Sequence, residues 1–263
     1  MSDIDLGALA ADIAREAGDL AKRRRDSGFA LAATKSTLAD IVTEADREVE
    51  QLIRERLRTE RPEDGFLGEE TGAQRGTSGL TWVVDPIDGT VNYAYGIATY
   101  SVSIAVVEGE PDPEQWQGVA SAVYAPALGE LFTATRGEGA WLDGRRLAVT
   151  TETPAGALLG TGFGYDPATH DGDLLMVRRV MTMARDLRRM GSAAIDLSYV
   201  AAGRLDGFFE RGLNAWDFAA GALLVQEAGG VISRLELDSS RPMFVAGGSA
   251  VHDRLRTIIS GAD

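Results

Sequence analysis

Apolar positions near the start of the chain recur with helical spacing, and later ones form shorter runs typical of strands. One apolar stripe predicts a helix over residues 4–25 and consists of Leu6, Leu9, Ile13, Ala17 and Leu20. A second helix is predicted to begin after Thr43 and to end before Pro62, because proline disfavours a continuing helix. Residues 65–68 then indicate a short extended segment, and residues 71–80, rich in Gly, Thr and Ser, a mobile surface loop.

Strand-like runs dominate the middle of the chain. They cover residues 81–84, 101–107, 117–124 and 130–135. The dipeptide Asp143-Gly144, which follows them, is a hairpin signal. We therefore expect an antiparallel sheet in this part of the protein.

Helices and short strands alternate in the second half. Helices are predicted over residues 173–186, 192–202, 216–228 and 251–259, and strands over residues 158–163, 207–210, 231–233 and 244–246. This mixture, without a sharp linker, indicates a layered α/β (α+β) sandwich of two packed halves. We place the first, α+β half at residues 1–150, with the antiparallel sheet and most candidate ligands, and the second, α/β half at residues 151–263.

Two carboxylates follow the buried strand predicted at residues 81–84. Asp85 should end that strand because Pro86 cannot donate a hydrogen bond to a central ladder, and Asp88 follows in a stiff turn. Residues 77–107 contain no Lys or Arg to separate the two charges, so a hard divalent cation such as Mg²⁺ is the natural partner. An ordinary Asp-Gly turn is the alternative. We favour the cation because the turn follows a hydrophobic strand and another acidic pair lies just upstream.

Candidate acids also occur at two other places. Glu69 follows a short extended segment, and Asp217 begins an unusually apolar helix, where a carboxylate also complements the helix dipole. If these two meet Asp85 and Asp88, the four carboxylates can hold more than one divalent ion. Such sites suit in-line displacement at phosphorus.

Other segments bear on the reaction class. Gly89 and Thr90 offer backbone N–H groups to phosphate oxygens directly after the two Asp residues. A nucleophilic serine is unsupported, since no Gly-x-Ser-x-Gly segment occurs and both histidines, His170 and His252, lie in polar contexts. The glycine-rich run at residues 160–164 lacks the spacing of a dinucleotide fingerprint, and forms either a tight turn near the substrate or a flexible loop.

Composition narrows the class of protein. The chain has 263 residues, of which 44% are hydrophobic and 25% charged, the profile of a soluble globular protein. A net charge of −14 argues against a nucleic-acid-binding surface, and the absence of cysteine excludes thiol catalysis and Cys-ligated zinc. No signal peptide or membrane span is evident in the sequence, so we expect a cytoplasmic protein without membrane contact.

Three motifs, in this order, resemble those of the inositol monophosphatase family, within the lithium-sensitive, magnesium-dependent phosphatases. They are Gly68-Glu69-Glu70, Asp85-Pro86-Ile87-Asp88-Gly89-Thr90-Val91-Asn92-Tyr93, and Trp216-Asp217-Phe218-Ala219-Ala220-Gly221-Ala222. Lys35-Ser36 and residues 40–46 also resemble the family's N-terminal loop and helix start. The resemblance covers nearly the whole chain. It implies a five-layer αβαβα fold, a homodimer and inhibition by Li⁺.

The resemblance also implies a role for each matched residue. The implied ligands of two or three Mg²⁺ per subunit are Glu69, Asp85, the backbone carbonyl of Ile87, Asp88 and Asp217. The implied catalytic residues, which position the attacking water, are Glu69, Thr90 and Asp46. The implied substrate contacts are Asp88, Gly89, Thr90, Ser192, Ala193, Glu210 and Asp217. For Glu210, which would contact inositol hydroxyls, a solvent carboxylate at a strand end is the alternative.

Residues 159–165 and 188–194 look most like bacterial inositol-1-monophosphatases. The expected reaction is therefore Mg²⁺-dependent hydrolysis of myo-inositol 1-phosphate to inositol and phosphate. Histidinol phosphate, nucleotide bisphosphates and fructose bisphosphate are the alternative substrates; Asn214, where animal members often have a His, bears on this choice. Two interpretations come from other classes: a regulatory protein that acts through a protein partner, and a carboxylate cluster that binds Ca²⁺ for stability.

Overall fold

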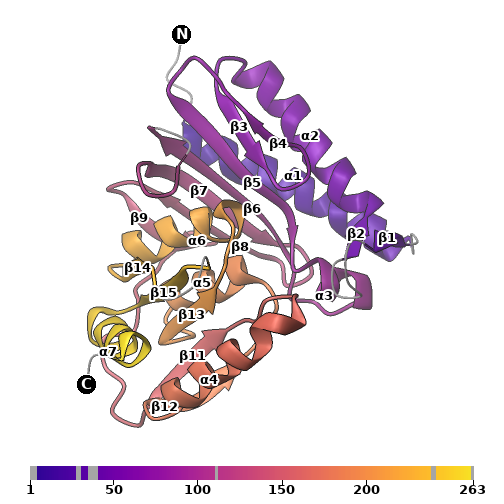
Figure 1. Ribbon diagram of the computed structural model, residues 1–263. Helices are drawn as coiled ribbons and strands as arrows, with labels where there is room; N and C mark the ends of the chain where they lie inside the picture. The colour runs from indigo at the N-terminus through magenta and orange to yellow at the C-terminus, as the bar shows by residue number, and fades with distance from the viewer. Residues whose placement is uncertain (1–4, 28–30, 35–40, 110–111, 238–240, 262–263) are drawn as a thin grey trace.

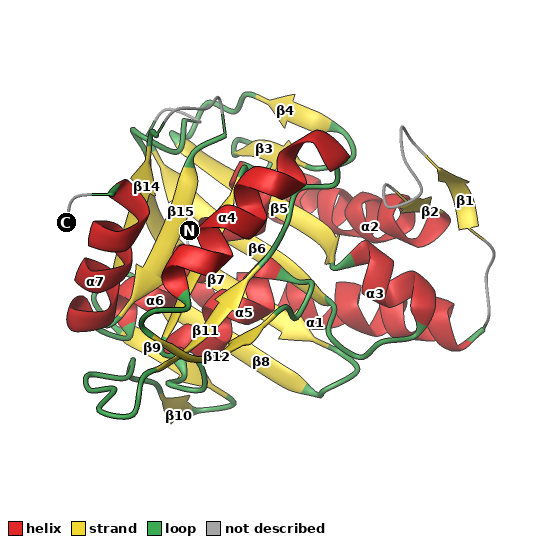
Figure 2. Ribbon diagram, turned by 60° about the horizontal axis from the view of Figure 1, so that its bottom comes forward, coloured by secondary structure: helices red, strands yellow, loops and turns green. Residues whose placement is uncertain are grey.

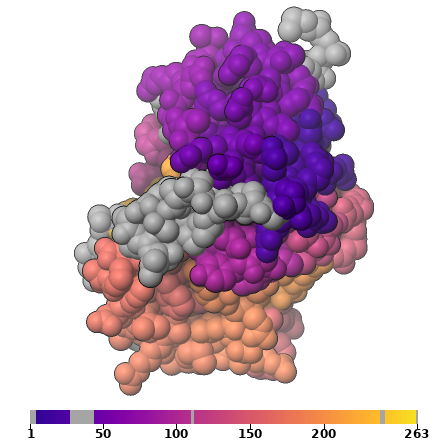
Figure 3. Space-filling model, turned by 90° about the vertical axis from the view of Figure 1, so that its right-hand side faces the viewer, coloured from indigo at the N-terminus to yellow at the C-terminus, as the bar shows by residue number. Residues whose placement is uncertain are grey.

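Helices and sheets alternate in five layers (Figure 1). The structure is a computed structural model, and it describes residues 5–27, 31–34, 41–109, 112–237 and 241–261. The part of the N-terminal resemblance at Lys35, Ser36 and Asp40 lies outside the described residues. The space-filling view of Figure 3 shows the indigo-to-purple N-terminal segments above the salmon-to-orange segments that follow residue 150.

The larger sheet has eight strands in the order β10-β9-β8-β7-β6-β5-β3-β4. Its strands are β3 (Gly65–Gly68), β4 (Gly72–Gln74), β5 (Leu80–Asp88), β6 (Ser101–Glu108), β7 (Gln117–Ala125), β8 (Glu130–Thr135), β9 (Gly139–Leu142) and β10 (Arg145–Arg146). Neighbouring strands are antiparallel except β3 and β5, which are parallel. The predicted antiparallel sheet is therefore confirmed. A separate two-stranded sheet pairs β1 (Leu31–Thr34) with β2 (Ile41–Thr43).

The smaller sheet has five strands in the order β12-β11-β13-β15-β14. Its strands are β11 (Ala157–Thr161), β12 (Ala184–Arg188), β13 (Gly207–Arg211), β14 (Val231–Leu235) and β15 (Met243–Gly247). β11 is parallel to both of its neighbours, whereas β15 is antiparallel to both of its own. Parallel neighbours need a crossover connection, and α4 (His170–Val180) supplies the one between β11 and β12.

Three pairs of helices cover the faces of the two sheets. The outer face of the larger sheet packs against α1 (Leu6–Asp26) and α2 (Glu44–Glu60). Between the sheets lie α5 (Ala193–Ala201) and α6 (Ala215–Glu227). The outer face of the smaller sheet packs against α4 (His170–Val180), which follows the 3-10 turn η1 (Pro167–Thr169), and α7 (Ser249–Ser260), as Figure 2 shows. In the described part of the chain, no helix is both long enough and apolar enough to cross a bilayer.

The position of α6 explains its unusually apolar sequence. Every residue from Phe218 to Val225 is buried, because α6 packs against the larger sheet on one side and against β14 and β15 on the other. Gly221 allows close approach to α5, since an added Cβ would lie 2.5 Å from Leu197 Cβ. A helix enclosed on all sides needs no polar face. This layer holds the start of α6 in place, and the site described below depends on it.

Pro86 does not end its strand, contrary to the prediction. β5 continues to Asp88, which pairs with Ser101 on β6, and the register shifts between Asp85 and Asp88. Pro86 lies within this shift, where the regular ladder is interrupted, so its missing N–H is tolerated. The shift also carries the strand on to Asp88 in an extended conformation.

Other boundaries differ from the prediction as well. The predicted loop at residues 71–80 contains β4, which pairs with β3. The predicted helix at residues 173–186 ends with α4 at Val180, and residues 184–188 form β12 instead. β12 is an exposed edge strand with polar and charged side chains, so it lacks the apolar signal of a strand. A short helix, α3 (Thr90–Tyr95), follows β5 and was not predicted.

Candidate active site

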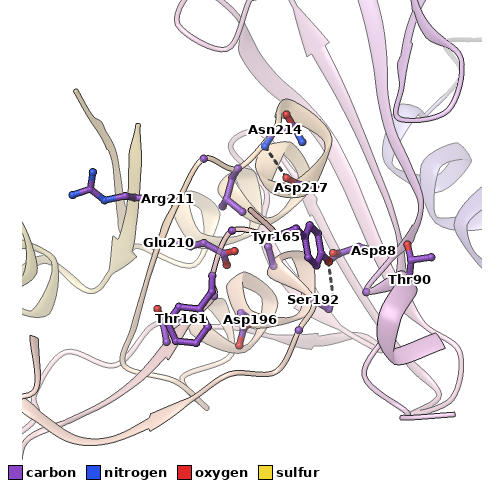
Figure 4. Close-up of a pocket in the computed structure, with 18 of the residues that line it drawn as sticks. Asp88, Thr90, Thr161, Tyr165, Ser192, Asp196, Glu210, Arg211, Asn214 and Asp217 are labelled. Atoms are coloured by element: carbon purple, nitrogen blue, oxygen red, sulfur yellow. Dashed lines mark hydrogen bonds between the residues drawn. The ribbon is translucent and has the colours of Figure 1, made fainter. Parts of the chain in front are cut away.

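A cavity of about 340 Å³ lies where the carboxyl end of β5, the starts of α5 and α6, and the end of β13 meet. Figure 4 shows Asp88 and Thr90 on one side of this cavity, and Thr161, Asp196 and Glu210 on the other. These residues come from both sheets and from the helix layer between them. The site therefore exists only when the whole sandwich is assembled.

The turn after β5 is held by its own hydrogen bonds. The backbone N–H of Ile87 donates to Asp85 Oδ1, and Thr90 Oγ1 donates to the Ile87 carbonyl oxygen, each over 3.1 Å. Gly89 has a φ of 89°, in the left-handed region that favours glycine. An added Cβ there would lie 3.0 Å from the Gly191 carbonyl oxygen. Glycine is therefore required here both by the backbone conformation and by the space.

Asp88 links β5 to the start of α5, 104 residues later. Ser192 Oγ donates to Asp88 Oδ2 over 2.6 Å, and the Ala194 N–H donates to the same oxygen over 2.7 Å. Burial raises the pKa of Asp88 to about 6, although both hydrogen bonds and the charge of Arg189 favour the ionised form. The free-energy cost of burying the ionised Asp88 is therefore larger than the stabilisation that the hydrogen bonds and Arg189 provide.

Asp217 both caps a helix and lines the cavity. Its Oδ2 accepts the backbone N–H of Asn214 over 2.6 Å at the start of α6. Burial raises the pKa of Asp217 well above its usual range, and the charges of Asp88 and Glu69 raise it further. The helix-start role considered from the sequence is therefore correct, and the same position brings the carboxylate to the cavity.

The other two predicted acids lie at the same place. Asp85 is 2% exposed, and Glu69, directly after β3, also lines the cavity. Burial raises the pKa of Asp85 well above its usual range, and the charges of Glu69, Asp88 and Asp217 add to this effect. The fold therefore brings all four sequence-predicted carboxylates around one cavity, where they repel one another.

The remaining predicted site residues fall into two groups. Ile87, Gly89, Thr90, Ser192, Ala193 and Glu210 line the cavity. Asp46, buried on α2, does not line it, although its charge raises the pKa of Asp85. Asp46 therefore influences the charge of Asp85 from outside the cavity lining.

The carboxylates do not form a ready-made cation cage in this conformation. Over the described ranges, no three Asp, Glu, His or Cys side chains are arranged so that they could hold a metal ion. Asp88 and Asp217 direct an oxygen to protein donors instead. The donor set nevertheless fits a hard divalent cation in its chemistry, because it consists of buried oxygen ligands whose mutual repulsion a cation would relieve.

Several cavity residues were not predicted from the sequence. They are Tyr165, Arg189, Asp196 and Arg241, whereas Thr161 belongs to the glycine-rich run 160–164, for which a turn near the substrate was one of the two predictions. Asp196 carried a usable signal, since it is the one charged residue within the apolar helix α5. Arg189 carried a weaker one, because it precedes the segment that contributes Ser192 and Ala193.

The two histidines lie elsewhere. His252 is buried in α7, where its Nε2 lies 2.9 Å from Ser233 Oγ and its Nδ1 lies 3.5 Å from Asp253 Oδ1. His170 Nε2 lies 3.0 Å from the Gly164 carbonyl oxygen. Neither histidine lines the cavity, so neither is placed to act as a base there.

Comparison with known proteins identifies the family. The model of the inositol monophosphatase family matches residues 5–257. The chain belongs to the inositol monophosphatase family. This membership confirms the resemblance seen in the three sequence motifs, and the five-layer fold agrees with it.

Similar proteins within the inositol monophosphatase family carry two kinds of name. The chain is 44% identical over 228 residues to the "Inositol-1-monophosphatase" of Rhizobium meliloti (strain 1021), covering 84% of this chain and 83% of that protein. It is 42% identical over 229 residues to the "Nus factor SuhB" of Escherichia coli (strain K12), covering 86% and 83%. The crystal structure of the extragenic suppressor protein suhB from Bartonella henselae superposes with a TM-score of 0.86 at 35% identity, covering 97% and 98% of the two chains.

Proposed function

We propose that this protein is a Mg²⁺-dependent phosphomonoesterase that hydrolyses myo-inositol 1-phosphate to inositol and phosphate. One observation carries the proposal: the four carboxylates of the family motifs surround a single cavity beside the backbone of Gly89 and Thr90. Family membership supports a phosphatase activity. The choice of inositol phosphate follows the similarity to a protein named inositol-1-monophosphatase.

In this proposal the ligands of two or three Mg²⁺ are Glu69, Asp85, the Ile87 carbonyl, Asp88 and Asp217. When bound, the ions would neutralise the substrate phosphate and lower the pKa of a coordinated water. Asp88 and Asp217 accept hydrogen bonds from Ser192, Ala194 and Asn214 through Oδ2, so the second oxygen of each carboxylate would be available to a cation.

The protein's own groups would orient the phosphate and the attacking water. The backbone of Gly89 and Thr90 borders the cavity and offers N–H groups to phosphate oxygens. Thr90 Oγ1, held at the Ile87 carbonyl, and the carboxylate of Glu69 lie on the cavity wall and would position the water. We prefer Thr90 to Asp46 as the partner of Glu69, because Asp46 does not line the cavity.

The far side of the cavity would hold the alcohol part of the substrate. Glu210, at the end of β13, lines this side together with Ser192 and Ala193. Burial raises the pKa of Glu210 to about 7, so its carboxyl group can accept or donate hydrogen bonds to hydroxyls near neutral pH. We further propose a cytoplasmic homodimer inhibited by Li⁺, as the family resemblance implies.

The test is phosphate release from myo-inositol 1-phosphate, histidinol phosphate, fructose 1,6-bisphosphate and adenosine 3′,5′-bisphosphate. Each substrate is assayed with Mg²⁺, with EDTA, and with Mg²⁺ plus Li⁺. We expect Mg²⁺-dependent, Li⁺-inhibited turnover that is fastest with inositol phosphate. A different leading substrate would refute the substrate assignment while keeping the mechanism, and no release from any of them would refute both.

A second candidate is a regulatory role through a macromolecular partner. The name "Nus factor SuhB" of the 42% identical Escherichia coli protein favours it. The net charge of −14 favours a protein partner over nucleic acid. If partner binding is retained in Asp85→Asn, which should abolish turnover, the two roles are separate. If Asp85→Asn also abolishes partner binding, that binding depends on the metal site.

A further inference from the structure

Two carboxyl groups lie directly over two glycines, one in β11 and one just after its end. A Cβ added to Gly160 would lie 3.0 Å from Asp196 Oδ1, and one added to Gly162 would lie 2.1 Å from Glu210 Oε2. Residues two apart in an extended chain face the same side. Gly160 and Gly162 therefore leave one face of the backbone bare, and the carboxyl groups of Asp196 and Glu210 fill the space. We call these four residues the glycine-carboxylate floor; Gly162, Asp196 and Glu210 line the cavity.

Asp196 belongs to this floor, and among the described residues one oxygen of its carboxyl group has no hydrogen-bond partner. That oxygen is Oδ1, and the side chain is 1% exposed. Buried polar groups are almost always hydrogen-bonded, so an orphan oxygen calls for a ligand or a water. Asp196 lines the cavity, so its carboxyl group is placed to meet a molecule bound there.

A purely structural role for Asp196 explains less. A carboxylate in the first turn of α5 complements the helix dipole. The cap of that helix, however, is Ser192, whose Oγ accepts the Ile195 N–H over 3.3 Å. The neighbouring buried hydroxyl of Ser198 is satisfied by the Ala194 carbonyl over 2.7 Å. Asp196 is thus distinguished within α5 as a buried carboxyl group that lines the cavity and whose Oδ1 has no hydrogen-bond partner among the described residues.

We propose that Asp196 is a specificity-determining residue that hydrogen-bonds a hydroxyl group of a polyol phosphate, beside the hydroxyl bound by Glu210. The inference rests on the proposed function, because it names the class of alcohol that the same site accepts. Two residues along an extended strand span about 7 Å, so the two carboxyl groups over Gly160 and Gly162 face different hydroxyls of one ring-sized polyol. An alcohol without such hydroxyls would leave both groups unsatisfied.

The electrostatics of the floor agree with this role. Burial raises the pKa of Asp196 well above its usual range, and the charges of Glu210 and Asp88 raise it further. The charge of Arg189, which also lines the cavity, opposes the shift. A carboxyl group that keeps its proton can donate one hydrogen bond and accept another, and a substrate hydroxyl offers both.

The test compares two substrates in four proteins. We would measure kcat/KM with Mg²⁺ for myo-inositol 1-phosphate and for phenyl phosphate, whose leaving group has no further hydroxyl. The proteins are the wild type, Asp196→Ala, Asp196→Asn and the control Ser198→Ala, which removes a buried, satisfied polar group from the same helix. Melting temperatures in EDTA report on folding.

Asp196→Ala should lower kcat/KM for inositol phosphate about tenfold or more and leave phenyl phosphate within about twofold. Asp196→Asn should retain most of the activity because an amide both donates and accepts, and Ser198→Ala should leave the ratio of the two substrates unchanged. Equal losses for both substrates, or no loss, would overturn the inference. A wild type that releases phosphate from neither substrate would refute the proposed function instead.

A substrate-side test holds even if Asp196→Ala does not fold. Wild-type kcat/KM would be measured for the monodeoxy analogues of myo-inositol 1-phosphate. Two different hydroxyls should each matter about tenfold, one for Glu210 and one for Asp196. Gly162→Ala, whose Cβ meets the end of the Glu210 side chain, should erase the penalty for only one of them. A penalty at a single hydroxyl would contradict the role of Asp196.

Discussion

Replacing Glu210 with Gln should stabilise the protein at neutral pH and leave its stability nearly unchanged in acid. Burial raises the pKa of Glu210 to about 7 from 4.5, the charge of Arg189 opposes the shift, and the charge of Asp88 adds to it. This difference of about 2.5 units corresponds to about 3 kcal/mol at 1.36 kcal/mol per unit. Gln keeps the shape of the side chain and does not ionise.

The sign follows from proton linkage. The folded protein holds the Glu210 proton more tightly than the unfolded chain, so ionisation destabilises the fold. The loss begins as the pH rises above the unfolded pKa of 4.5 and is complete above the folded pKa of about 7. The variant should therefore match the wild type near pH 4 and exceed its unfolding free energy by up to about 3 kcal/mol near pH 8.

Thermal unfolding in EDTA, from about pH 4 to pH 8, measures this effect. A gain of about 3 kcal/mol corresponds to a rise of about 5–10 °C in melting temperature for a chain of this size. EDTA is needed because a bound cation would change the charges around the cavity. An offset between the two proteins that does not change with pH, or a variant that is less stable near pH 8, would refute the reasoning.

Three further predictions concern the turn after β5 and the carboxylates. Asp217→Asn should lower kcat at saturating Mg²⁺ by at least about 100-fold, and a loss below about tenfold would argue against a ligand role. Gly89→Ala should cost about 1–3 kcal/mol in urea unfolding, because its Cβ meets two carbonyl oxygens. Its control is Gly129→Ala, which has a similar φ but open space, and an equal loss in both would exclude the steric term. Mg²⁺ at about 100 times its Kd should stabilise the wild type by about 2.7 kcal/mol, and an equal gain in Asp85→Asn would place the ion elsewhere.

The pattern of apolar residues was enough to predict those elements whose structure depends mainly on burial of one face. The apolar stripe of α1 and the runs of β6, β7 and β8 were predicted within a few residues, because one-sided burial imposes its period on the sequence. Prediction was wrong where the environment overrides local preference. Pro86 lies inside a strand because a register shift spares it a ladder hydrogen bond, and β12 is an edge strand whose polar residues resemble a loop or helix end.

The chemistry of the site was also largely visible in the sequence. Residue types and spacing singled out Glu69, Asp85, Asp88 and Asp217 as candidates, the family resemblance implied that they meet, and the fold places all four at one cavity. Their detailed roles stay predictions. Asp196 escaped notice because a single acid in an apolar helix has a simple explanation as a helix-start charge. Only the structure shows that Asp196 Oδ1 lies against Gly160 and has no hydrogen-bond partner among the described residues.

The sequence by itself determined the kinds of elements, the oxygen-rich donor set and the lack of any thiol chemistry, since these depend on residue type and short spacing. Only the tertiary structure decided that Asp88 meets Ser192 across 104 residues and that burial holds the pKa of Asp88 near 6. Both follow from packing α5 and α6 between the two sheets, which removes water from the carboxylates. Proximity and desolvation are properties of the assembled layers, and no single segment of the chain encodes them.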